Sequence, residues 1–180
     1  VVSSGASSIA IGGDDLDDAS KTAGVNDTFK YYTGNDLIEN SATPYTRHTK
    51  SDGAASIAIG VKAQSEGYLS TAVGVRSSSS GDASSAFGMG SSATREGSLA
   101  LGAGSRGEAV DGVALGSKSV ANRAATGSGA VFVPTGANNA RILATMSTTG
   151  AVSVGRAAAE NQTAVRRQIT NVAAGTEDSD

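Results

Sequence analysis

The chain has 180 residues and a formal net charge of −3, which argues against nucleic acid or an anionic membrane as its partner. Aromatic residues make up only 4% of the sequence and glycines number 24, so large side chains are too few to fill a conventional core. There is no cysteine, which excludes a disulfide framework.

The N-terminal segment ends in Ser8-Ile-Ala-Ile-Gly12, where large and small side chains alternate. Side chains that change character at every second residue predict a strand. The first residues fall in the middle of such a pattern, and the sequence contains no signal peptide and no membrane-spanning segment. We therefore expect the chain to be a fragment of a longer protein.

A long non-repeating segment, Gly13–Ala55, comes next and holds four of the seven aromatic residues. We expect it to be a loop inserted into one coil of a rigid scaffold, with a short helix or hairpin around Phe29–Leu37. Two interpretations of its aromatic residues remain open: they pack the loop onto the scaffold, or they contact a ligand. The candidate ligand-binding residues are Phe29, Tyr31, Tyr32, Tyr45 and His48.

Neither a metal site nor a catalytic site is predicted in this segment. The acidic run Asp14–Asp18 lacks the spaced carboxylates and central glycine of a calcium loop, so we expect it to be solvated surface. His48 has no cysteine and no second histidine to share a metal, and no nucleophilic triad can be assembled around it. We expect no cofactor and no enzymatic activity.

Residues 56–125 consist of five consecutive repeats of 14 residues. In each repeat an alanine is followed two residues later by a glycine, with a bulky apolar residue between them. Self-similarity at a fixed short period indicates a solenoid. Each coil should contain one strand of about five residues, then a second, serine-rich strand, with turns between them.

The two faces of the first strand have different expected surroundings. A flattened coil has room inside only for small side chains, so the large ones should point outward. The expected interior residues are Ala58, Gly60, Ala72, Gly74, Ala86, Gly88, Ala100, Gly102, Ala114 and Gly116. The expected outward stripe consists of Ile57, Ile59, Val73, Phe87, Leu99, Leu101, Val113 and Leu115, flanked by Val61, Val75 and Met89.

An apolar stripe of this extent marks an interface. Because every copy of the chain carries the same stripe, we expect a closed cyclic homo-oligomer. Charged residues gather elsewhere, at the seventh position of the repeats (Lys62, Arg76, Lys118) and in the turns, where we expect a solvated rim.

The repeat breaks down again after residue 125. Residues 130–134 and 140–146 are strand-like runs separated by a turn signal, and Val152-Ser-Val-Gly155 restores a last strand with serine in the alanine position. The polar, alanine-rich stretch 156–171 is compatible with a short helix.

The repeated Ser-x-Ala-x-Gly-x-x-Ser pattern, as in Ser70–Ser77, resembles the YadA-like head of trimeric autotransporter adhesins. The C-terminal stretch from Arg167 to Asp180 resembles the neck that joins such heads to a coiled-coil stalk. This resemblance implies an all-β, left-handed parallel β-roll assembled as a homotrimer, with a head at 1–155 and a neck at 156–180. Residues 13–55 would then be a loop insertion, 56–125 the regular repeats and 126–155 irregular last coils.

The resemblance also implies secretion by a signal peptide outside this sequence, an outer-membrane anchor beyond its C-terminus, and a place on the bacterial cell surface. The implied partners are a host cell surface or an extracellular matrix protein. Repeats of this family often begin with asparagine, whereas this chain has Ala55, Leu69, Ala83, Gly97 and Asp111 there, which makes collagen a less certain partner. The alternative is a non-adhesive structural trimer, such as a surface spacer or a phage fibre.

Overall fold

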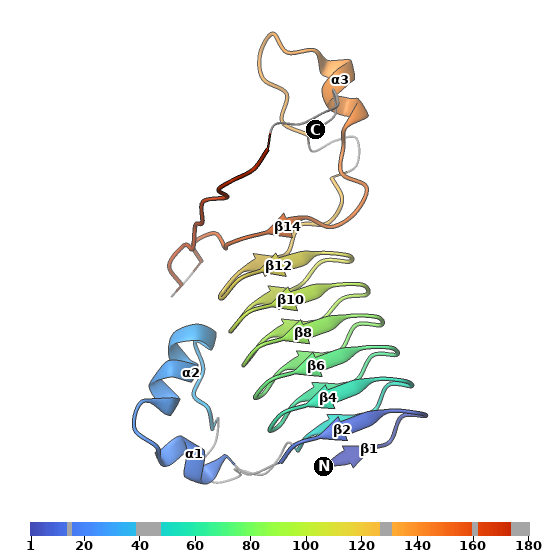
Figure 1. Cartoon of the computed structure of the whole chain (residues 1–180). Coiled ribbons are helices and arrows are strands. Elements are labelled where there is room, and N and C mark those ends of the chain that lie inside the picture. The colour runs from blue at the N-terminus through green and yellow to red at the C-terminus, as the bar shows by residue number, and fades with distance from the viewer. Residues whose placement is uncertain (14–15, 39–47, 127–130, 160–161, 174–180) are drawn as a thin grey trace.

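The computed structural model of the chain describes residues 1–13, 16–38, 48–126, 131–159 and 162–173. Within these residues, the strands form two seven-stranded parallel sheets that make up the two walls of a β-solenoid (Figure 1). One wall contains β2 (Ile9–Ile11), β4 (Ile57–Ile59), β6 (Thr71–Val73), β8 (Ser85–Phe87), β10 (Leu99–Leu101), β12 (Val113–Leu115) and β14 (Val152–Ser153). The other contains β1 (Val2–Ser3), β3 (Lys50–Ser51), β5 (Gln64–Ser65), β7 (Ser78–Ser79), β9 (Ser92–Ala93), β11 (Arg106–Gly107) and β13 (Val120–Ala121).

Each regular coil stacks on the next with its repeat positions in register. Ala58 pairs with Ala72, Ala72 with Ala86, and Ala86 with Ala100, always 14 residues further along the chain. The predicted all-β parallel solenoid is therefore confirmed. The strands are shorter than the expected five residues, with two or three each, because tight turns occupy the rest of every coil.

Small side chains fill the space between the two walls. The alanines of the first strand, Ala58, Ala72, Ala86, Ala100 and Ala114, are fully buried. Beside them the interior contains serines, which are also small enough to fit between the walls. Their hydroxyl groups pair across the coil in Ser51–Ser56, Ser65–Ser70 and Ser79–Ser84, each with an oxygen–oxygen distance of 2.6 Å. Ser3 and Ser8 form the same pair at the exposed N-terminal end. In the described part of the chain, every buried side-chain nitrogen or oxygen has a hydrogen-bond partner, as burial of polar groups requires.

The repeat glycines lie at a corner of the coil and are only partly buried. At Gly60 the backbone φ is +129°, and an added Cβ would lie 2.6 Å from the carbonyl oxygen of Gly74 in the next coil. A side chain at this corner would therefore separate neighbouring coils. The expected placement of these glycines in the interior is corrected in this respect: they are needed because two backbones pass close together, not because the roll is narrow.

Each coil also turns through two residues in the left-handed region. One is the position before the interior serine, where φ is 58° at Leu69 and 54° at Ala83. The other is the seventh position of the repeat, where φ is 54° at Arg76. Asparagine and glycine adopt this conformation at less cost than alanine or leucine, so Leu69 and Ala83 are held in a backbone conformation that such residues rarely adopt.

The first of two insertions interrupts the solenoid after β2. Strand pairs β1–β3 and β2–β4 join residues 48 apart instead of 14, so one coil carries the extra chain. We call residues 13–49 the excursion. Its described part contains α1 (Asp17–Lys21) and α2 (Val25–Thr33), which lie beside one edge of the solenoid (Figure 1).

The second insertion lies between β12 and β14, which pair Val113 with Val152. It contains α3 (Asn139–Ala144), so the strand predicted for 140–146 is wrong, and residues 131–134 form no strand either. Ser153 pairs with Ala114, as expected for a restored last strand.

The chain after β14 forms a small antiparallel hairpin. Arg156 pairs with Val165 and Ala159 with Gln162. The short helix considered for 156–171 is wrong for the described residues of that stretch, because their backbone groups bond across the hairpin instead of along a helix. Over the described parts of the chain, no helix has the length and apolar character to cross a membrane.

Candidate functional site

The excursion is packed against the solenoid through an apolar cluster. Leu16, Phe29 and Leu37 are buried in it, and Val61, Val75 and Met89 of three successive coils pack against them. The last three were expected to flank the apolar stripe on the open surface. They are covered instead by the same chain, and the loop-packing interpretation of Phe29 is the one that its burial supports.

Helix α2 is bounded by a glycine at each end and has a buried apolar residue that packs on the solenoid. Gly24 and Gly34 adopt the left-handed conformation on either side, with φ of 80° and 82°, and the amide of Gly34 bonds to the carbonyl of Lys30 at 2.8 Å. This is the glycine-terminated helix end seen in many proteins. Phe29 is the buried residue of α2 and faces the roll.

Two glycines of the solenoid let α2 approach closely. Gly90 and Gly104 occupy the seventh repeat position, where other coils have Lys62, Arg76 and Lys118. A Cβ at Gly90 would overlap the methyl group of Thr33, and one at Gly104 would overlap the carbonyl oxygen of Tyr32. Two consecutive coils thus lose their charged side chain where the helix lies. Glycine in place of a charged residue at this repeat position was the sequence signal for docking.

The charged residues on either side of these glycines hold the excursion in place. The Arg76 guanidinium donates to the carbonyl oxygens of Asp36 and Leu37 at 2.7 and 2.8 Å, and it lies 5.1 Å from the centre of the Phe29 ring. The Lys118 ammonium lies 3.1 Å from the centre of the Tyr31 ring. Such cation–π contacts contribute about 0.5–1 kcal/mol at exposed sites. The expectation of a merely solvated rim is wrong for Arg76 and Lys118.

A polar contact closes the loop that follows α2. Asp36 accepts hydrogen bonds from Asn26 at 3.0 Å and from Lys30 at 3.1 Å. The Asn26 hydrogen bond, followed by that of Lys30, holds the pKa of Asp36 below its ordinary value. The Asn26 side chain also accepts from the amide of Leu37 at 2.8 Å. Asn26 and Lys30 of α2 therefore hold in place the segment that carries Leu37 into the apolar cluster.

Replacing Gly104 by alanine should detach α2 without unfolding the solenoid. The new methyl group would collide with the Tyr32 carbonyl, and the rigid coil leaves the helix as the part that moves. We expect faster amide hydrogen exchange in 25–33 and unchanged exchange in β8 and β10.

Gly97→Ala is the matched control, because Gly97 has nearly the same φ (63° against 64°) but is opposed by the movable side chain of Asp111. Equal exchange rates in α2 for both variants would contradict the docking role of Gly104.

The predicted ligand-binding residues do not form one site. Phe29 is buried, so its side chain is not available to a ligand, and Tyr45 lies outside the described residues. Tyr31 and Tyr32 pack edge to face with ring centres 5.0 Å apart, and Tyr31 is 68% exposed. His48 precedes β3, five coils before Lys118, which is roughly 24 Å at the usual spacing of strands.

The large residues of the first strand form a continuous column on the outer side of their sheet. We call Ile59, Val73, Phe87, Leu101 and Leu115 the apolar ladder. In the single chain Phe87 is 37% exposed, Leu101 41% and Leu115 45%. Among the described residues, the apolar cluster of the excursion includes the flanking residues Val61, Val75 and Met89 but no residue of the predicted stripe itself.

The described residues contain no group of three or more histidine, cysteine or acidic side chains able to hold a metal ion. The arrangement of exposed Tyr31, half-buried Tyr32 and Lys118 on a stiff base is suited to contact with another surface.

Comparison with family models finds the YadA head domain repeat, matched at residues 51–77, 65–91 and 79–105. These matches overlap and follow the 14-residue register of the strands. Comparison with curated proteins finds no match.

Proposed function

This chain carries a YadA-like head domain of the kind found in trimeric autotransporter adhesins, and from that premise we propose that it is an adhesive head that binds host cells or extracellular matrix. Three copies would associate through the apolar ladder and its neighbours Ile57, Leu99 and Val113. The head would stand on the bacterial surface, secreted and anchored through parts of a longer protein. Its role would be binding, without enzymatic activity or a cofactor.

The observation that carries the adhesive role is the presentation of tyrosines on the docked excursion. The repeats are nearly uniform and offer only a periodic surface, whereas the excursion adds exposed Tyr31 beside Lys118 on a rigid base. Tyrosine is enriched at protein interfaces because it combines a large apolar area with a polar tip. Three copies of a weak site can raise avidity by roughly 10²–10⁴ without new contacts.

Shortening the excursion should abolish adhesion while leaving the solenoid intact. Replacing residues 13–49 by a copy of Val61-Lys-Ala63 restores an ordinary 14-residue coil between β2 and β3. Adhesion of the purified chain to host cells and to a panel of matrix proteins should fall to background. The same variant should keep its β circular dichroism spectrum, since strand pairing is unchanged.

A second variant removes the presented ring only. Tyr31→Ser should weaken adhesion, whereas Tyr68→Ser should not, because Tyr68 is similarly exposed (63%) but lies on the solenoid away from the excursion. Undiminished adhesion in the shortened protein would place the site on the repeats. No adhesion by the unmodified chain to any surface tested would favour the structural spacer.

A further inference from the structure

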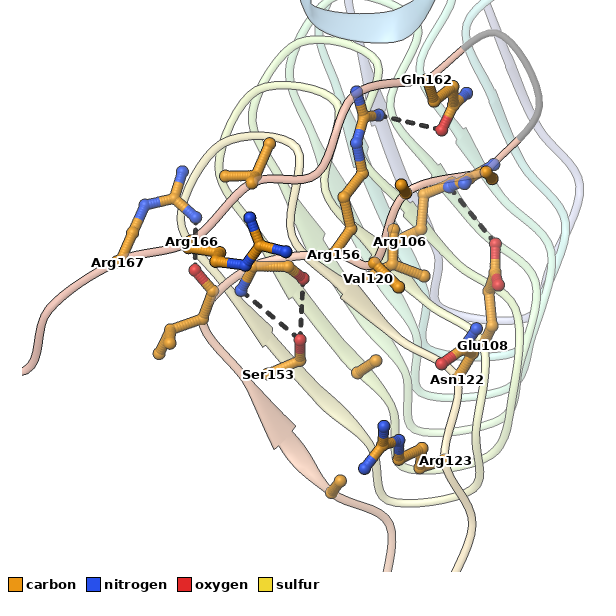
Figure 2. A pocket seen from close by; sticks show the side chains of 18 of the residues that line it. Arg106, Glu108, Val120, Asn122, Arg123, Ser153, Arg156, Gln162, Arg166 and Arg167 are labelled. Carbon is orange, nitrogen blue, oxygen red and sulfur yellow. Dashed lines mark hydrogen bonds and ion pairs between the residues drawn. The ribbon is translucent and has the colours of Figure 1, made fainter.

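A second candidate site lies at the C-terminal end of the solenoid, where the Gln162 side chain comes close to Gly34 at the end of α2. Here an open cavity of about 580 Å³ is lined by the last coils and by the hairpin that follows β14 (Figure 2). The hairpin is fixed to the coil by a hydrogen bond from the Val120 amide to the Gly155 carbonyl at 2.8 Å, and internally by the Arg156–Val165 pair. Cavities of this size are typical of small-ligand sites.

The charge of this cavity is opposite to that of the chain. Its lining contains Arg106, Arg123, Arg156, Arg166 and Arg167 but, among the described residues, only one carboxylate, that of Glu108. The whole chain has a net charge of −3, so the arginines are concentrated here and do not reflect composition. Guanidinium groups gathered in this way repel each other, and a bound anion would relieve that repulsion.

Two of the arginines are held in fixed positions by neutral acceptors. Arg156 donates to the Thr163 carbonyl at 3.1 Å and to the Gln162 side chain at 3.0 Å. Arg167 donates to the hydroxyl of Ser119 at 3.0 Å and to the carbonyl of Val154. These contacts orient the side chains without neutralising their charge, which lowers the ordering cost of binding a ligand.

The other arginines differ in how far they are already paired. Arg106 forms an ion pair with Glu108 at 3.3 Å. Arg123 and Arg166 are exposed, and in the described part of the chain no hydrogen bond or ion pair is found for their guanidinium groups. Both therefore remain available to a ligand, and both can be changed without breaking a contact that supports the fold.

We propose that this cavity binds an acidic polysaccharide through its sulfate or carboxylate groups. The planar guanidinium fork matches both groups in geometry. The arginines lie on several sides of the cavity instead of converging on one point (Figure 2), which suits charges repeated along a chain. Asn122, Gln162 and Ser153 in the same lining provide neutral hydrogen-bonding groups for sugar hydroxyls.

An extended anionic surface fits this cavity less well than a single polysaccharide strand. The rest of the chain carries a net negative charge. An extended anionic surface docked on the cavity would repel any acidic side chain that came within a Debye length of it, about 8 Å. The two proposed sites are neighbours, because Arg167 bonds to Ser117 and Ser119 on either side of Lys118, but they share no residue, so the arginine variants below change only the cavity.

Binding can be measured in solution by fluorescence anisotropy with labelled heparin, hyaluronan and poly-glutamate. Heparin carries sulfates and carboxylates, hyaluronan carboxylates only, and poly-glutamate tests an acidic peptide. The wild-type chain should bind heparin at 150 mM salt, and the Arg123→Ala, Arg166→Ala double variant should bind about tenfold more weakly. Hyaluronan binding of similar strength would show that carboxylates suffice, and its absence would assign the site to sulfate.

The matched control is Arg95→Ala with Lys21→Ala, which makes the same change of net charge at exposed positions outside the cavity. Its heparin affinity should stay within about twofold of wild type. An equal loss in both double variants would overturn the site, since net charge alone would then explain binding. Preference for poly-glutamate over both polysaccharides would overturn the ligand class. Loss of adhesion in the shortened-excursion variant with heparin binding intact would separate the two proposals.

Discussion

The double variant Phe87→Asp, Leu101→Asp is expected to convert the proposed trimer into monomers or to unfold it. The two side chains stand in adjacent coils of one sheet and are 37% and 41% exposed in the single chain. Complete burial of such a side chain contributes roughly 1.5–3 kcal/mol, and three chains would each lose two of these contributions. A carboxylate buried in their place would in addition be unpaired. Sedimentation equilibrium over a dilution series measures the result.

Ser78→Asp with Ser92→Asp is the matched control for this experiment. These serines lie in adjacent strands of the opposite sheet, β7 and β9, and their side chains are partly exposed. The control should keep the mass of the wild-type assembly. A wild-type chain that is a folded monomer at micromolar concentration would contradict association through the apolar ladder.

Leucine at Ala86 or Ala100 is expected to destabilise the protein more than removal of a ladder side chain by Leu101→Ala. Both alanines are fully buried and pack with Ala93 between the two walls. The walls are joined to neighbouring coils by hydrogen bonds at nearly constant spacing, so they cannot separate locally to admit three more carbon atoms. Overpacking of this kind costs about 1–3 kcal/mol, and thermal melts followed by circular dichroism would detect it.

The control for overpacking is Ser85→Leu, one residue before Ala86 in β8. Ser85 points to the outer side, and the same column has leucine at Leu99, so the larger side chain should be tolerated. If Ala86→Leu has the melting temperature of the wild type while that of Ser85→Leu is lowered, the inner and outer faces of the strand have been assigned in reverse.

The sequence by itself determined the solenoid, because its signal is local and repeated. A strand needs only alternation, and a stack of coils needs only that the alternation return at a fixed period. Ala72 and Val73 therefore indicated the strand, its inward face and its outward face before any contact was known, whereas the place of Gly74 at a corner came only from the structure. The resemblance to an adhesin head rested mainly on the same repeats, of which the family model matches residues 51–105.

Where the period is lost, local patterns were weaker guides. The strand-like run at 140–146 forms a helix, and 156–171 forms a hairpin where described instead of a helix. In short apolar runs, helix and strand patterns are hard to tell apart, and which one forms depends on neighbours distant in sequence. Serines of the small inner face, such as Ser56, were expected inside the coil, but the pairing of their hydroxyl groups with serines of the opposite wall could be known only from the structure.

Only the tertiary structure decided what happens to the excursion. That Phe29 is buried, that α2 lies over Gly90 and Gly104, and that Arg76 holds the following loop all depend on contacts between residues far apart in the sequence. The same is true of the arginine-lined cavity, which brings β11 together with a hairpin some 50 residues later. Contacts between repeats recur in every coil, so they are visible in the sequence as a periodic pattern. The contacts of the excursion and of the cavity each occur once, between residues distant in sequence, and leave no local pattern from which they could be predicted.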